Sequence, residues 1–355
     1  MINFLSLSAS ITTILAILGA SCGSGEDERV MSSASSVLSS SSASTESVSM
    51  SLSDALEALS DSNPSGGSSS SLFLQETNPM SISKERSCEV SDDQAVVTVS
   101  TSIEGERSFE TSLGAQITRT ISGAGTHVRT WSRQDSSIAC NNPSTAAAID
   151  WTSDGISGLS LAVTVERSKT ATISRIKNDT EISRSKSFTT TGTRQVQWTS
   201  HTDNDDGTFT RVKTVSSSMA RNSSGTTREG EEINLSLTVE SLDGQDLSIT
   251  VVRNSTDLSL VSKEISSGAL KSFSDENAYV VTSFENYLIN FDSESCAPVS
   301  GSVLSKFYEE GTEEPVKTLQ LSVVNGEYSL EDITDSENPT AITDFDYDLC
   351  YSENF

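Results

Sequence analysis

Residues 319–330 read LQLSVVNGEYSL, and this stretch decides the fold class. Apolar and polar residues alternate on both sides of Asn325-Gly326, which is the period of a β-strand with one covered face. Asn-Gly supplies the two positive-φ positions of a tight hairpin turn. A two-residue turn pairs Val323 with Tyr328 and keeps the apolar residues of both strands on one face. The stretch therefore predicts an antiparallel β-hairpin with a defined register.

The same period of two recurs upstream. It is clearest in residues 161–165, 235–239 and 247–251, within a region rich in Thr, Val, Ile and Ser. Between the last two, a three-residue loop ending at Gly244 would pair Val239 with Leu247. The chain is therefore predicted to be mainly β, with antiparallel strands in a large twisted sheet that forms a sandwich or an open barrel.

Composition divides the 355 residues into four parts. Residues 1–21 are an export signal, and residues 22–86 form a Ser-rich tether whose apolar spacing allows a short helix over 47–60. Residues 87–290 are the antiparallel β domain. Residues 291–355 are a smaller β module, and the segment 229–355 carries 5 basic and 26 acidic groups.

The charge balance narrows the function classes. The chain has 23 Lys and Arg against 50 Asp and Glu, for a formal charge of −27. Such acidity argues against a nucleic-acid partner. The chain contains two histidines, which limits the supply of general bases and metal ligands. We predict no metal site and no cofactor.

The N-terminus has the form of an export signal, because a short apolar run is followed by small residues. The segment Leu18-Gly19-Ala20-Ser21-Cys22 resembles the lipobox of bacterial lipoproteins. The resemblance implies a fatty acyl group on Cys22 and attachment to the cell envelope. Since Gly23 follows the cysteine, it also implies the outer membrane if the source has two membranes. Ordinary secretory cleavage nearby, or an uncleaved amphiphilic start, are the alternatives.

Four cysteines remain once Cys22 is set aside. An even number in an exported chain indicates two disulfides, for which three pairings are possible. The most economical pairing joins Cys88 to Cys140 and Cys296 to Cys350, each within one region of the chain.

Basic residues recur in pairs two positions apart, and on a strand such pairs project from one face. If their strands are neighbours, the eight cations form a ribbon that holds an anionic polymer or lipid head groups. A solvated sheet face is the plainer interpretation. The pairs are Arg167/Lys169, Arg175/Lys177, Arg184/Lys186 and Arg211/Lys213.

Other polar clusters have ordinary explanations. Residues 203–207, DNDDG, look like a calcium loop but lack the EF-hand spacing, so we expect a hairpin loop. His127 and His201 each lie within four residues of a tryptophan and are expected to be ordinary sheet residues. The three tryptophans are expected to pack in the core rather than stack on sugars.

We therefore predict an exported, lipid-anchored envelope protein that is not an enzyme and has a structural or adhesive surface role. Its contacts would be the membrane, through the lipid anchor, and an unidentified protein, glycan or anionic polymer. A lipid or glycan carrier with an apolar cavity in the β domain is the first alternative. An envelope hydrolase, which would need one of the histidines in a cleft, is the second.

Overall fold

The computed structural model describes residues 81–110, 116–134, 136–177, 180–226, 232–275, 278–291, 296–309 and 311–342. The predicted export signal, Cys22, the helix expected over 47–60 and Cys350 lie outside this range. Within it the chain is all β, as predicted. No helix long and apolar enough to span a membrane occurs among these residues.

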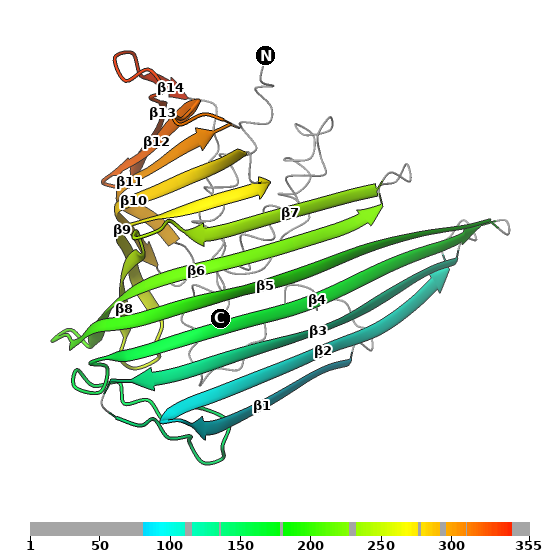
Figure 1. The fold of residues 1–355 in the computed structure, drawn as a ribbon, viewed down its shortest axis with the longest axis horizontal. Helices are drawn as coiled ribbons and strands as arrows, with labels where there is room; N and C mark the ends of the chain where they lie inside the picture. Colours follow the sequence, from blue (N-terminus) through cyan, green and yellow to red (C-terminus); the bar gives the residue numbers. More distant parts are fainter. Residues whose placement is uncertain are drawn as a thin grey trace.

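In the described residues, fourteen antiparallel strands form one sheet (Figure 1). The order follows the chain from β1 to β7 and then from β9 to β14, while β8 pairs with β6 and β9. The strands are β1 (Ser81–Ser91), β2 (Gln94–Glu110), β3 (Gln116–Arg133), β4 (Leu159–Lys177), β5 (Thr180–Asp203), β6 (Thr208–Thr226), β7 (Glu232–Ser241), β8 (Leu247–Asn254), β9 (Leu260–Asp275), β10 (Ala278–Phe291), β11 (Cys296–Tyr308), β12 (Lys317–Val324), β13 (Glu327–Asp332) and β14 (Thr340–Ile342).

The predicted C-terminal hairpin is confirmed in its register. Val323 pairs with Tyr328 across β12 and β13, and Leu321 pairs with Leu330. Asn325 has φ of 53° and Gly326 has φ of 81°, as a turn of this type requires. β11 pairs with both β10 and β12, so the sheet runs without interruption across residue 290, where the two β regions were divided.

The predicted pairing of Val239 with Leu247 is wrong. Val239 lies opposite Met219, and Leu247 lies opposite Val215, so β7 and β8 lie end to end along one edge of β6. Gly244 does have a positive φ of 70°, but its turn interrupts a strand instead of reversing it. Hydrophobic alternation cannot distinguish these two arrangements, because both keep the apolar residues on one face.

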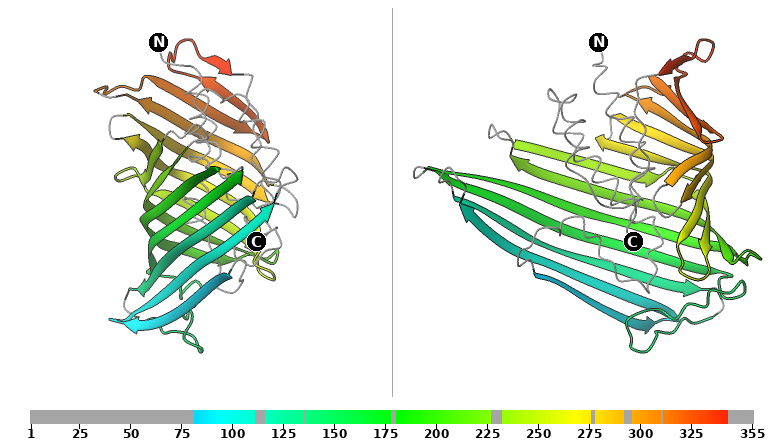
Figure 2. Two further views of the ribbon diagram at one scale, coloured as in Figure 1. Left: turned by 90° about the vertical axis from the view of Figure 1, so that its right-hand side faces the viewer. Right: turned by 180° about the vertical axis from the view of Figure 1, so that it is seen from behind.

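One face of the sheet carries the apolar core. All strand residues of the buried cluster project from this face, which we call the inner face; the opposite one is the outer face. A loop between β3 and β4 adds Ile138, Ala147 and Ile156 to the same cluster. The right-hand view of Figure 2 shows the long strands β2–β6 extending well beyond the ends of β9–β14. The long strands therefore present much more inner face than the core covers.

Candidate functional site

The inner face of the long strands collects positive charge. The registers of β1–β6 place Trp131, Leu161 and Val196 in one cross-strand row of the inner face. Counted from this row, every second residue along each strand also projects from the inner face. Every Lys and Arg of these six strands falls at such a position. Those with described side chains are Lys84, Arg86, Arg119, Arg129, Arg133, Arg167, Lys169, Arg175, Arg184, Lys186, Arg194, Arg211, Lys213 and Arg221.

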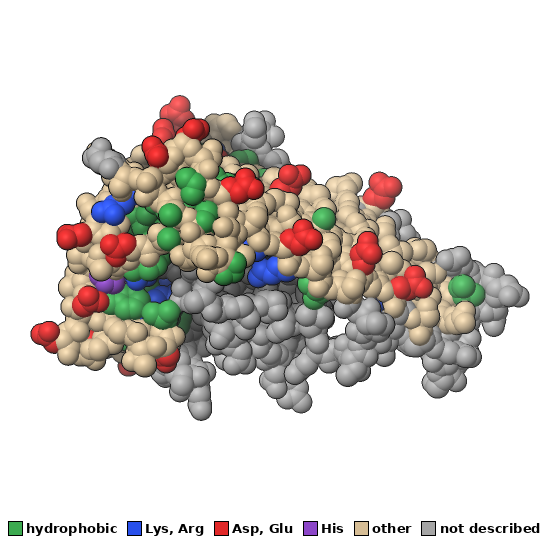
Figure 3. Space-filling view, turned by 90° about the horizontal axis from the view of Figure 1, so that it is seen from below, with side chains coloured by type: hydrophobic (Ala, Val, Ile, Leu, Met, Phe, Trp, Pro, Cys, Tyr) green, Lys and Arg blue, Asp and Glu red, His purple; other side chains and the backbone are tan. Residues whose placement is uncertain are grey.

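The outer face of the same strands has the opposite character. Its acidic side chains include Glu85, Glu104 and Glu166, which all occupy the alternate rows. Cross-strand hydroxyl pairs fill much of the remainder, such as Ser187 with Ser224 at 2.7 Å. The space-filling view shows acidic side chains scattered over an exposed surface that is mostly uncharged (Figure 3). Strand alternation therefore separates the two signs of charge across the thickness of one sheet.

The eight predicted cations come from three adjacent strands rather than four. Arg167/Lys169 and Arg175/Lys177 share β4, while Arg184/Lys186 lie on β5 and Arg211/Lys213 on β6. Lys177 ends β4, and its side chain lies outside the described set. The register between β4 and β5 brings the pairs on these two strands close together. Lys169 lies opposite Phe188, and Lys186 lies opposite Ala171.

The pair on β6 lies elsewhere. Lys213 is opposite Trp198, and the inner-face row of Arg167 crosses β6 at Arg221, eight residues away. At about 3.3 Å per residue this separates the two groups by roughly 26 Å. Lys213 is 1% exposed, so it belongs to the packed end of the sheet. The prediction of one ribbon from all four pairs is wrong in this respect.

Small and aromatic residues alternate with the cations. Gly125 lies opposite Arg167, and a Cβ there would come within 2.9 Å of the arginine Cγ. The Phe188 ring has the Lys186 ammonium at 5.1 Å and the Arg221 guanidinium at 4.8 Å from its centroid. The glycines give the long side chains room to lie along the sheet, and the ring spaces their charged ends.

Burial and the surrounding positive charges both act on His127. Arg167 Nε donates a hydrogen bond of 2.6 Å to His127 Nε2, which requires a neutral ring. Burial, followed by the charges of Arg167, Arg129 and Lys84, lowers the pKa of His127 from 6.5 to about 4. Burial and two neighbouring arginines also lower the pKa of Arg129. This part of the inner face therefore disfavours any further positive charge.

The other end of the inner face is closed by three tryptophans. Trp131 stacks on Trp198 at 5.4 Å between ring centroids, and Trp151 from the β3–β4 loop meets both rings edge-on. Arg211 lies over the Trp151 ring at 4.1 Å. The predicted disulfide Cys88–Cys140 is present and ties this loop to β1. As expected, the tryptophans pack in the core.

Neither imidazole is arranged as a general base. His201 is buried, its Nδ1 accepts a hydrogen bond from Arg211 Nε at 3.1 Å, and its Nε2 faces Asp203 at 3.2 Å. That geometry leaves the ring proton on Nε2. The lone pair of His127 is likewise occupied by Arg167. A general base needs an accessible lone pair near the proton that it removes.

The DNDDG segment is a hairpin loop between β5 and β6. Asn204 and Thr208 are joined by a backbone hydrogen bond of 2.8 Å, and Gly207 has φ of 81°. Asp206 accepts hydrogen bonds from Thr208, which lower its pKa. Among the residues that the structure describes, no group of three or more His, Cys, Asp or Glu side chains is placed to hold a metal ion.

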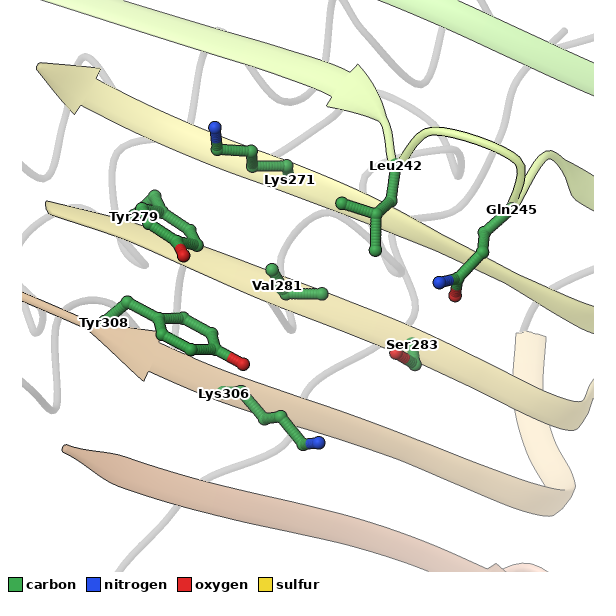
Figure 4. A pocket seen from close by; sticks show the side chains of 8 residues that line it. All are labelled: Leu242, Gln245, Lys271, Tyr279, Val281, Ser283, Lys306 and Tyr308. Carbon is green, nitrogen blue, oxygen red and sulfur yellow. The ribbon is translucent and has the colours of Figure 1, made fainter. Parts of the chain in front are cut away.

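A second feature lies on the outer face, where sequence reasoning predicted nothing. A cavity of about 440 Å³ opens over β9, β10 and β11 (Figure 4). We call it the Tyr–Lys groove, and its lining residues are Leu242, Gln245, Lys271, Tyr279, Val281, Ser283, Lys306 and Tyr308. These residues come from three strands and a loop, so no local motif could reveal them.

No protein-family model, curated protein or solved structure matches this chain.

Proposed function

We propose that the protein is an exported, lipid-anchored envelope protein that uses the inner face of β1–β6 to hold an anionic polymer. The observation that carries the proposal is the sorting of charge, with every Lys and Arg of six strands at inner-face positions. The lipid anchor at Cys22 rests on the resemblance to lipoproteins. The polymer-binding role rests on the geometry of the cationic surface.

The dimensions of the surface suit an extended ligand. β4 has 19 residues, which corresponds to about 60 Å of strand, and six strands span roughly 24 Å across. Arg194, Lys213 and Arg221 are buried and Arg211 lies over Trp151, so ten of the 14 described cations remain for a ligand. They give on the order of one positive charge per 150 Å². Paired cations on one strand are about 6.6 Å apart, so a polymer with an anionic group at similar intervals can meet several of them at once. A small ligand could use only a fraction of this surface.

The electrostatics support the same conclusion. Many like charges on one face repel each other, and a polyanion removes that repulsion while releasing its own counterions. Burial is the largest cause of the lowered pKa of His127, and the charges of Arg167, Arg129 and Lys84 lower it further. Binding should therefore weaken steeply as salt concentration rises, in proportion to the number of contacts formed.

The alternatives receive less support. A carrier requires an enclosed apolar cavity, whereas the Tyr–Lys groove is open to solvent and contains lysine, tyrosine and glutamine side chains. The hydrolase considered above would use a histidine in a cleft, and both imidazoles have their lone pairs engaged by arginines. We therefore propose a binding role without catalysis.

The polymer-binding role can be tested with long-chain polyphosphate. We expect a dissociation constant that rises with salt and at least about tenfold weaker binding after removal of four inner-face cations. Removal of the two outer-face cations is the control for position on the sheet, and it should leave the affinity unchanged. The test variant combines Arg167→Ser, Lys169→Ser, Arg175→Ser and Lys186→Ser; the control combines Lys271→Ser and Lys306→Ser.

Equal affinity for the two variants, with both folded by thermal melting, would contradict the proposed role of the inner face. The anchor has a separate test. Cys22→Ala should abolish metabolic labelling with palmitate and release the protein from membranes. Continued labelling of this variant would disprove lipidation at Cys22.

A further inference from the structure

The Tyr–Lys groove holds the two exceptions to the charge pattern of the sheet. Every other described strand Lys or Arg occupies an inner-face position, whereas Lys271 and Lys306 project from the outer face. They lie on either side of Val281 in one cross-strand row. Two strand spacings separate them, so their backbones are about 10 Å apart.

The ammonium groups of the groove are not joined to carboxylates. Glu240 lies opposite Lys271 across β7 and β9, yet no ion pair within 4.0 Å joins Lys271 or Lys306 to a carboxylate in the described part of the chain. Lys271 lies over the Phe273 and Tyr279 rings at 5.0 and 4.7 Å. Two cations are therefore held at a groove on an otherwise acidic face.

An aromatic surface borders the lysines. Tyr279 and Tyr308 stack with their ring centroids 4.6 Å apart and their planes at 11°. Phe273 lies opposite Tyr279 and extends the aromatic row by one strand. Figure 4 shows both tyrosines beside the lysines, with Gln245 and Ser283 at the other end of the groove. The rings offer apolar area, and the amide and hydroxyl groups offer hydrogen bonds.

We propose that the Tyr–Lys groove binds an acidic saccharide, with one carboxylate or sulfate group of the sugars at Lys271 and another at Lys306. Aromatic rings pack against the C–H faces of a sugar ring, and the polar groups meet its hydroxyls. An extended acidic peptide fits less well, because peptides that join sheets add to an edge strand. The groove lies on the face of β9–β11, away from the sheet edges at β1 and β14.

This site is independent of the proposed function. It lies on the opposite face from the polymer-binding surface and uses different cations. The two proposals can therefore fail separately.

The probe is tetragalacturonate, and its fully methyl-esterified form is the neutral control. Calorimetry on the full-length protein should show binding of the acid, with the ester at least about tenfold weaker. The double variant Lys271→Gln/Lys306→Gln should also lose at least about tenfold in affinity for the acid. Lys263→Gln, at an inner-face position of β9 outside the polymer-binding strands, should bind the tetrasaccharide as the unmodified protein does.

Three results would overturn the proposal: no binding of tetragalacturonate at about 10 mM, equal affinity for acid and ester, or full affinity in the double variant. The double variant should keep the thermal melting midpoint of the unmodified protein, which shows that it is folded. A second variant, Tyr308→Leu, tests the aromatic surface. It should weaken tetragalacturonate binding while leaving both lysines in place.

Discussion

The two halves of the sheet use the same strand alternation for different purposes. In β10–β13 the inner-face positions hold residues such as Phe284, Tyr287 and Leu321, all of them buried. In the long strands the corresponding positions, away from the tryptophans, hold Lys and Arg beside glycine. The strands also differ in length, with 24 residues in β5 and 6 in β13. Packing of the apolar core therefore does not explain why the long strands extend beyond it.

This difference indicates where stability and function reside. The buried cluster on the inner face includes residues from Cys88 in β1 to Leu330 in β13, and it supplies most of the apolar burial. The extended part of the long strands is held mainly by backbone ladders and cross-strand hydroxyl pairs. We attribute its exposed cations, such as Arg119, Arg175 and Lys186, to binding. Substitutions in the two regions should then have distinct consequences.

The largest expected effect is the difference in stability between a substitution in the core and one in the extended part of the long strands. Trp198→Ala removes a ring that is 3% exposed and stacked on Trp131, and it should lower the free energy of unfolding by about 4 kcal/mol. Ile173→Ala removes a side chain that is 46% exposed and should cost less than about 1 kcal/mol. Chemical denaturation measures both. Similar losses would mean that the extended strands are packed like the core.

The disulfide should have the next largest effect. Cys88 and Cys140 close a loop with a sequence separation of 52, and the pairing restrains the unfolded chain. Replacing both by serine should lower the free energy of unfolding by about 3 kcal/mol. Trp151 should become more accessible to fluorescence quenchers, because its loop is no longer tied to β1. An unchanged midpoint of denaturation would show that the loop is held by packing alone.

A smaller effect should depend on pH. Folding lowers the pKa of His127 from 6.5 to about 4, so between these values the unfolded chain binds a proton that the folded chain does not. The free energy of unfolding should therefore decrease as pH falls through this window, by on the order of 2 kcal/mol. His127→Gln keeps an acceptor for Arg167 and should remove this part of the dependence. The same slope in the variant would assign it to other groups.

The smallest effect is expected on the outer face. Glu166 is exposed and projects away from the core, so Glu166→Gln should change the free energy of unfolding by no more than about 0.5 kcal/mol. Polyphosphate binding should also change little. A large gain in affinity would indicate that charge on both faces governs binding.

Sequence reasoning reached the fold class and the C-terminal hairpin because these depend on local period and turn chemistry. It placed a turn at Gly244 but paired β7 with β8 wrongly, since a turn does not specify which strand becomes the neighbour. The pairs of cations were recognised by their spacing. Isolated cations such as Arg221 and Arg119 were missed, because they join the inner face only through cross-strand register. The Tyr–Lys groove depends on three strands and was invisible for the same reason.

The most direct test of the central claim is a lysine footprint with and without long-chain polyphosphate. Acetylation followed by mass spectrometry compares Lys84, Lys169 and Lys186 on the inner face with Lys271 and Lys306 on the outer face of the same molecule. We predict that polyphosphate slows modification of the inner-face lysines and leaves the outer-face pair unchanged. Protection of Lys271 and Lys306 alone, or equal protection of both sets, would contradict the assignment of polymer binding to the inner face.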